Sequence, residues 1–511
     1  MALRKFLRLI PALLIIALMS VPSYADSSFK ESLLSLEGVL SVEDVVQSGD
    51  AKFAEKYLVT FEQPLDWNNP DSVTFPQRCL IGFNGFDRPN VMYVSGYNLN
   101  DERFPTSSHE IADMFSGNYI SVEYRFFSKS APQGLSHRGT ALWEYLTDEY
   151  ASNDFHNIME QLKDILSGTW VFTGTSKGGQ ATNVFAYYYP DDADAYVSYV
   201  APFCNGNDDP RAFNAIYNTI GNERYGEAKA KEYRDLMMDF QVEAIKNRDY
   251  LQPKLVKTSS QDLALYEITS GEEFEEIVVN HVYEHWQYSK SFESIDKVMK
   301  LPRIDDPSTD VIENKEFLDG IAAIITADMD SEEAEDTVFP YSVQAAKENG
   351  NCGLRLQPLR DELAKLGITM ELTAEREKNF LAAMNFTAEQ KRLFTFDPAM
   401  RNKMLEWTNT NQSNVIMIYG DSDPWYFMRL PETDNPNIHI FTSSNHAHEV
   451  TIKNMEEEYS SQIKELLSQW LIEYPDIKPL SSSSSSGCNS GLFAYGHGLL
   501  LIALILKRKT H

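Results

Sequence analysis

Short apolar runs alternate with amphipathic stretches in the first half of the chain. Residues 91–94 are four apolar residues closed by Gly96, a pattern typical of a buried strand. The apolar residues between 155 and 166 recur every three or four positions, which predicts a helix with one face in a core. Such alternation favours a parallel sheet covered on both faces. We predict strands at 90–95, 119–124, 170–173 and 196–201, and helices at 111–114, 155–166 and 177–188.

The pattern changes after the last of these strands. Residues 206–406 are rich in charge, and we predict them to be mostly helical without clear strands, for example at 233–247 and 370–384. This stretch separates the first group of strands from a second one. It is therefore predicted to be a large helical cap inserted into the sheet core.

The strand pattern then returns near the end of the chain. Apolar strands and a closing amphipathic helix are expected at 415–419, 438–441 and 455–470. We assign the two parts of the core to residues 26–205 and 407–475.

The first 25 residues have the layout of a secretory signal peptide. Basic residues precede a short apolar run at 9–21, and Ser23-Tyr24-Ala25 has the small residues of a cleavage site. The alternative is an uncleaved membrane anchor. The short run and the cleavage site favour an exported protein, located in the cell envelope or outside the cell.

The other end of the chain has a matching layout. A serine-rich linker at 476–486 precedes a segment at 487–511, in which Cys488 is followed by an apolar run and a basic end. This layout resembles bacterial C-terminal protein-sorting tails of the GlyGly-CTERM and Synerg-CTERM kind. The resemblance implies a tail that is membrane-inserted or processed by a sorting protease; a plain membrane anchor is the alternative.

The composition excludes several classes of function. A formal net charge of −30 makes nucleic acid an unfavourable partner. Cys79, Cys204 and Cys352 are the cysteines of the folded part, so at most one disulfide forms there. Residues 281–285 (His-Val-Tyr-Glu-His) have a metal-ligand spacing, but a pattern this short arises easily by chance. We expect neither a metal nor another cofactor.

One motif indicates nucleophilic chemistry. Gly174-Thr175-Ser176-Lys177-Gly178 fits Gly-x-Ser-x-Gly between a predicted strand and a predicted helix. A serine nucleophile sits on a sharp, strained turn, and the glycines remove side chains that would collide there. The backbone N–H of Lys177 can then donate to an oxyanion. A chance glycine-rich turn is the alternative, but its setting favours Ser176 as the nucleophile.

The serine needs a base, and the base needs an orienting carboxylate. In an α/β-hydrolase the acid follows the serine and the histidine comes last. Asp421 and Asp423 both follow the strand at 415–419, where such an acid belongs. We choose Asp423, because Pro424 fixes the turn directly after it; simple turn chemistry is the alternative.

Two histidines lie in the loop after the next strand. His446 and His448 both follow residues 438–441 in the order that an α/β-hydrolase requires. We prefer His446 as the base and keep His448 as the alternative. The second oxyanion donor is expected from the N–H of Tyr97 or Asn98, after the strand at 90–95, although an ordinary strand-end turn would look the same. The fold class is then an α/β-hydrolase core with a mostly parallel sheet and an inserted helical cap.

Several motifs resemble those of the prolyl tri/tetrapeptidyl aminopeptidase family of secreted bacterial serine peptidases, and more distantly prolylcarboxypeptidase and dipeptidyl peptidase II. They are Tyr93-Val94-Ser95-Gly96-Tyr97, Val122-Glu123-Tyr124-Arg125-Phe126-Phe127, Gly174-Thr175-Ser176-Lys177-Gly178-Gly179 and Asp423-Pro424-Trp425. The resemblance implies cleavage after proline near the N-terminus of short peptides, with an Asp-Pro-Trp acid and a histidine in the Asn445-His446 segment.

The resemblance also implies a site for the substrate's free amine. Asp208 and Asp209 are candidates, with a solvated acidic loop as the alternative. An esterase or lipase on the same fold, and a non-enzymatic envelope binding protein, are the rival functions. Binding alone requires no Ser, Asp and His set, so the motifs favour an enzyme with short proline-containing peptides as substrates.

Overall fold

The computed structural model describes residues 28–472, apart from 70, 138, 259–264, 269, 289, 304–311, 330–334 and 379–385. The predicted signal peptide, serine-rich linker and C-terminal segment lie outside these residues. In the described part, no helix is both long and apolar enough to cross a membrane.

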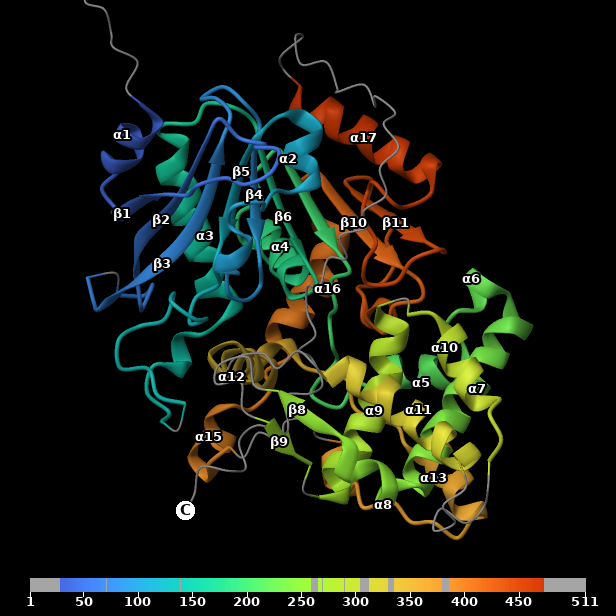
Figure 1. The fold of residues 1–511 in the computed structure, drawn as a ribbon. Coiled ribbons are helices and arrows are strands. Elements are labelled where there is room, and N and C mark those ends of the chain that lie inside the picture. The colour runs from blue at the N-terminus through green and yellow to red at the C-terminus, as the bar shows by residue number, and fades with distance from the viewer. Residues whose placement is uncertain are drawn as a thin grey trace, which may run out of the picture.

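A nine-stranded sheet lies in the upper part of the molecule in Figure 1. Its order is β1-β2-β3-β5-β4-β6-β7-β10-β11, and the strands from β5 to β11 run parallel. The six predicted strands are β4 (Asn90–Val94), β5 (Asn118–Val122), β6 (Trp170–Thr175), β7 (Ala195–Tyr199), β10 (Val415–Gly420) and β11 (Ile438–Ser443).

Three further strands extend one side of the sheet. They pair antiparallel with one another and, through the third, with β5. They are β1 (Val39–Asp44), β2 (Glu55–Pro64) and β3 (Thr74–Phe83). The sheet is therefore mostly parallel, as predicted, with an antiparallel edge.

Helices cover both faces of this sheet. On one face, α3 (Asp148–Lys163) and α4 (Lys177–Tyr188) contribute Phe155 and Phe185 to a core shared with β4 and β6. On the other face, α2 (Glu110–Phe115) and α17 (Glu457–Leu471) bury Ile111 and Leu467. A short first helix, α1 (Phe29–Leu34), packs on β1 and its neighbours. The two-sided cover explains why the parallel strands are apolar along their whole length.

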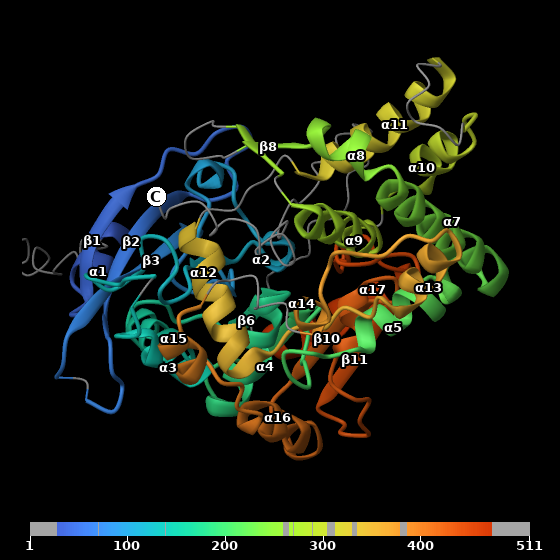
Figure 2. The same ribbon diagram turned by 90° about the horizontal axis from the view of Figure 1, so that it is seen from below.

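The chain between β7 and β10 is mostly helical and lies largely below the sheet in Figure 1. Its helices are α5 (Arg211–Asn218), α6 (Asn222–Tyr225), α7 (Glu227–Lys246), α8 (Arg248–Leu251), α9 (Gly271–Gln287), α10 (Phe292–Met299), α11 (Ile312–Met329), α12 (Glu335–Gln344), α13 (Gln357–Lys365), α14 (Ala374–Lys378), α15 (Ala388–Leu393) and α16 (Ala399–Thr410). A π-helical turn, Ala345–Asn349, continues α12. Seen from below, α12 lies across the core in front of the strands (Figure 2).

The cap differs from the expectations in two places. It contains a two-stranded antiparallel sheet, β8 (Val256–Thr258) and β9 (Leu265–Glu267), where no strand was expected. Of the helix expected at 370–384, residues 370–373 are not helical, α14 covers 374–378, and 379–384 lie outside the described residues. The Glu275 carboxylate accepts the backbone N–H groups of Glu371 and Leu372, at 3.0 and 2.7 Å. Those bonds hold the chain before α14 in a non-helical conformation.

Candidate active site

Ser176 lies on a strained turn between β6 and α4. Its φ of 59° and ψ of −120° are outside the usual regions for a residue with a side chain. Such a conformation costs on the order of 1–3 kcal/mol and persists where the surroundings enforce it. The Ser176 N–H donates to the carbonyl of Tyr199 on β7 at 2.9 Å, which holds the turn against the sheet edge.

The glycines around Ser176 are required by close backbone packing. A Cβ on Gly174 would lie 2.3 Å from the carbonyl oxygen of Gly178, and a Cβ on Gly178 would lie 2.3 Å from that of Val94. These separations are far below van der Waals contact. A side chain at either position would therefore force the backbone to shift, which is the physical reason for glycine at both ends of the Gly-x-Ser-x-Gly motif.

The loop after β4 lies directly against the start of α4. Gly96 has a φ of 77°, and a Cβ there would lie 2.6 Å from the backbone nitrogen of Gly178. The structure thus brings the Gly96–Asn98 loop beside the serine turn, as a second oxyanion donor requires. The Tyr97 N–H donates to Ser95 Oγ at 3.2 Å, which ties this loop to the end of β4.

Asp423 is fully buried after β10 and contacts a histidine. Its Oδ2 lies 2.7 Å from Nδ1 of His448, and its Oδ1 accepts the N–H of Trp425 at 3.0 Å. Burial raises the pKa of Asp423, and the neighbouring His448 opposes that rise. Asp421 instead accepts from the Ser422 hydroxyl at 3.1 Å, and burial raises its pKa to about 6. Of the two predicted acids, Asp423 is the one that the structure brings to a histidine.

The expected pairing of Asp423 with His446 was wrong. The His446 ring turns to the hydroxyl of Ser443, with Nδ1 at 2.9 Å from Oγ, and burial lowers its pKa. The His446 backbone packs against the end of β10, where a Cβ on Gly420 would lie 2.5 Å from its carbonyl oxygen. That contact fixes the loop so that His448, two residues further on, faces the acid.

Cap residues that the sequence analysis missed support this pair. The His448 N–H donates to the carbonyl of Gln287 at 2.9 Å, and its ring meets that of Tyr288 edge-on at 5.9 Å. The Trp425 ring lies edge-on to Tyr283 of α9 at 5.9 Å. In the sequence, residues 281–285 of this helix stand out only for their metal-ligand spacing. The apolar spacing of α9 was the signal for packing, although it does not reveal the packing partner.

The two aspartates proposed for the substrate amine are both paired with arginines. Asp209 binds Arg211 at 2.7 Å, and Asp208 binds Arg355 at 2.7 Å. Burial alone would raise the pKa of Asp209, but hydrogen bonds from Arg211 and the Asn205 backbone lower it. Each carboxylate is therefore already paired with a cation, and the Asp208 side chain is 46% exposed.

The histidines of α9 make aromatic contacts. His281 lies 5.1 Å from the ring of Phe240, and His285 lies 4.5 Å from that of Phe292. These contacts place both rings in the packing between α9 and its neighbours α7 and α10.

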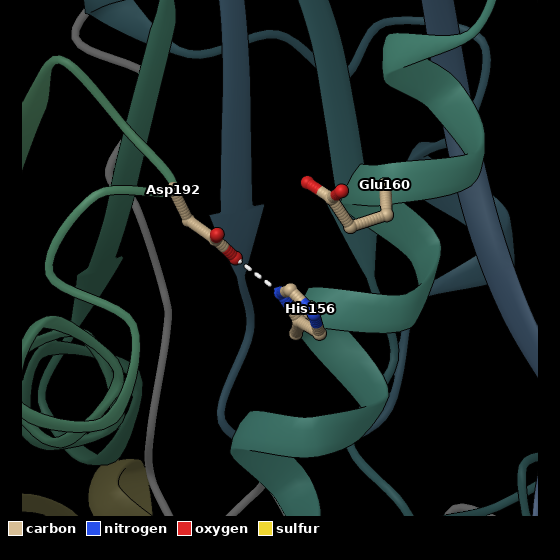
Figure 3. Close-up of side chains that lie close together, drawn as sticks. All are labelled: His156, Glu160 and Asp192. Atoms are coloured by element: carbon tan, nitrogen blue, oxygen red, sulfur yellow. Dashed lines mark hydrogen bonds and ion pairs between the residues drawn. The ribbon is translucent and has the colours of Figure 1, made fainter.

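A different group has ligand spacing among the described residues: His156, Glu160 and Asp192 (Figure 3). His156 Nδ1 lies 2.6 Å from Asp192, and the Lys163 ammonium lies 2.9 Å from Glu160 and 3.8 Å from Asp192. Because the Lys163 ammonium already lies beside both carboxylates, we assign no metal to this cluster.

Comparison with known proteins decides the family. The model of the PS-10 peptidase S37 family matches residues 23–464. The chain belongs to this family. It is 26% identical, over 403 residues, to a prolyl tri/tetrapeptidyl aminopeptidase from Streptomyces mobaraensis, an alignment that covers 78% of this chain and 75% of the relative. This S37 chain is thus a serine-type peptidase with an α/β-hydrolase core.

Solved structures with a similar arrangement include two hydrolases. A proline iminopeptidase from Mycobacterium smegmatis matches with a TM-score of 0.34 and 10% identity, covering 81% of this chain and 99% of that one. An alpha/beta fold family hydrolase from Bacillus anthracis matches with a TM-score of 0.29 and 11% identity, covering 81% and 98%.

Proposed function

We propose that this S37 peptidase is exported and removes tri- or tetrapeptides that end in proline from the N-terminus of short peptides. The contact between Asp423 and His448, at the sheet edge that carries Ser176, is the observation that best supports a working triad. The strands β6, β7 and β10 are parallel neighbours, so the residues that follow β6 and β10 share one edge. The preference for proline rests on the similarity to the Streptomyces mobaraensis enzyme.

In the proposed mechanism, His448 is the general base. Its Nδ1–H donates to Asp423, which leaves Nε2 as the acceptor for the Ser176 proton. The Ser176 oxygen attacks the carbonyl carbon of the proline residue, and the N–H groups of Lys177 and of Tyr97 or Asn98 stabilise the oxyanion. His448 then protonates the leaving amine, and water releases the acyl group by the reverse proton transfers.

Product analysis on a mixture of proline-containing peptides tests this function. We expect release of N-terminal tri- or tetrapeptides with a carboxyl-terminal proline, and no release from peptides with a blocked amine. A matched set of short acyl nitrophenyl esters serves as the comparison. Turnover of the esters without any turnover of the peptides would contradict the proposal and favour an esterase.

A further inference from the structure

The side chain of Lys177 has an unusual environment directly beside the nucleophile. The residue is 4% exposed, and its ammonium has no hydrogen-bond partner among the described residues. Nζ lies 3.1 Å from the ring centroid of Tyr124, with the rings of Phe127 and Tyr97 at 5.1 and 5.9 Å. A desolvated ammonium over an aromatic face is held by the ring quadrupole. The sequence pattern assigns only the backbone of Lys177 a function, so this side chain needs its own explanation.

The aromatic ring under the ammonium is connected to the oxyanion loop. The Tyr124 N–H donates to the carbonyl of Tyr97 at 3.0 Å, and the Tyr97 ring packs edge-on against Phe127 at 5.8 Å. The ammonium therefore lies on the residues that hold the loop carrying Asn98. The Lys177 side chain therefore connects the two expected oxyanion donors. One donor is the backbone N–H of Lys177 itself, and the other lies in the loop after β4, which the aromatic rings under the ammonium support.

The cap reaches the same place through α12 and the turn that follows it. Gln344 donates to the Tyr124 hydroxyl at 3.0 Å and to Asp148 at 2.6 Å. Glu348 accepts the N–H of Asp148 at 2.7 Å. The ring of Tyr341 lies 5.9 Å from that of Tyr97. Cap and core thus share one buried polar network around Lys177.

We propose that the ammonium of Lys177 is a positioning group that fixes the two halves of the oxyanion hole relative to each other, and does so while the cap turn is docked. This inference rests on the proposed function, because it assumes that Ser176 is acylated. The ammonium takes no part in a bond-making step. Its effect is on the geometry of the N–H groups, and a displacement of about 1 Å at such a site can cost on the order of a hundredfold in rate.

Charge at this site makes the proposal sensitive to pH. Burial lowers the pKa of Lys177 to about 7, while Asp148 and Glu348 oppose that change. Burial also raises the pKa of Glu348, to about 8, and that of Asp148. The other titratable groups around the network are the Tyr124 hydroxyl and Lys347, whose Nζ donates to the carbonyl of Trp143 at 2.7 Å. The cation is present below its pKa and is lost as the pH rises, so kcat should fall on the alkaline side above about pH 7.

The Lys177→Met variant tests this role, because methionine keeps an unbranched side chain without the charge. We expect kcat to fall about 10- to 100-fold with KM changed by less than about threefold. The alkaline decrease in kcat should disappear, and the acidic limb that reports the base should stay. Asp148→Asn removes the strongest charge that favours the ammonium, so the alkaline limb should move to lower pH.

A second buried lysine provides the control. Lys56 on β2 also has a pKa lowered by burial, to about 8, and its ammonium donates to the carbonyl of Ser107, at the antiparallel side of the sheet. Lys56→Met should reduce stability while kcat and the alkaline limb stay unchanged. If Lys177→Met does not fold, Asp148→Asn and Lys177→Arg still test the positioning role. Arginine keeps its positive charge at every pH used, so Lys177→Arg should preserve most of kcat and show no alkaline decrease.

The rate of Ser176 modification by a fluorophosphonate tests the proposed function and the positioning role of Lys177 separately. No modification of Ser176 in the wild type would reject the proposed function. Modification of Ser176 at the same rate and with the same pH profile in the wild type and Lys177→Met would reject the positioning role alone.

Discussion

At the scale of single residues, burial and hydrogen-bond partners give Asp423 and Asp421 different environments, although the two aspartates are close in the chain. Both follow β10, yet only Asp423 lies fully buried against a histidine ring. Asp421 bonds to the adjacent Ser422 hydroxyl instead. A carboxylate that accepts from Nδ1–H keeps the imidazole in the tautomer whose Nε2 can take a proton. We therefore expect the same substitution to have a large effect on kcat at Asp423 and almost none at Asp421.

Asp423→Asn should lower kcat by about 10⁴-fold, because the amide can donate to Nδ1 and so favours the wrong tautomer. Asp421→Asn is the matched control, two residues away with the same change in chemistry, and should leave kcat within about threefold. Initial rates on a proline-containing peptide measure both. Equal losses in the two variants, or a larger loss in Asp421→Asn, would contradict the assignment.

At this scale the sequence indicated which aspartate meets a histidine, but not which of the two histidines it meets. Pro424 after Asp423 is a local signal that can be read from the chain, because proline fixes the turn. The choice between His446 and His448 depends on how the loop packs on Gly420, which is a tertiary contact. Two histidines two positions apart offer no local signal that says which one turns inward.

At the scale of elements, the parallel strands and the serine turn were predicted with boundaries close to those observed. Continuous apolar runs identify strands that are buried on both faces. The antiparallel strands β1 to β3 were not predicted. In β1 no residue is fully buried, so its sequence shows little alternation of apolar and polar positions. The three-residue strands β8 and β9 are too short for any periodicity. Their pairing is decided by the fold around them.

The turn at Ser176 makes a prediction at this scale. Alanine in a helix is normally favoured over glycine by about 1 kcal/mol. At Gly178 the added Cβ would lie 2.3 Å from the Val94 carbonyl oxygen, which is backbone and cannot move alone. Gly178→Ala should therefore destabilise the protein instead of stabilising it. We expect the free energy of unfolding to fall by about 1–3 kcal/mol, with loss of activity.

A urea titration measures that change, and Gly206 offers a control. A Cβ on Gly206 would meet nothing within 4 Å. Gly206→Ala should leave the unfolding midpoint nearly unchanged and activity intact. A Gly178→Ala protein as stable and as active as the wild type would show that α4 does not pack on β4 as closely as described.

At the scale of the whole molecule, the cap and the core share the candidate site. Gln287 and Tyr288, at the end of α9, hold His448 from the cap side, and Glu348 bonds to the start of α3. The sequence predicted that a helical cap interrupts the sheet, because the change in pattern is visible over many residues. It could not predict which cap residues reach the site, since those contacts join positions more than a hundred residues apart.

The central claim is that Ser176 is activated by His448, and covalent labelling tests it most directly. The wild type, Ser176→Ala, His448→Ala and His446→Ala are treated with a fluorophosphonate probe, and the modified residue and the labelling rate are determined by mass spectrometry. We expect label on Ser176 at similar rates in the wild type and in His446→Ala, and no label in Ser176→Ala. In His448→Ala the labelling rate should fall by about 10⁴-fold or more. Label that persists in Ser176→Ala, or a loss confined to His446→Ala, would contradict it.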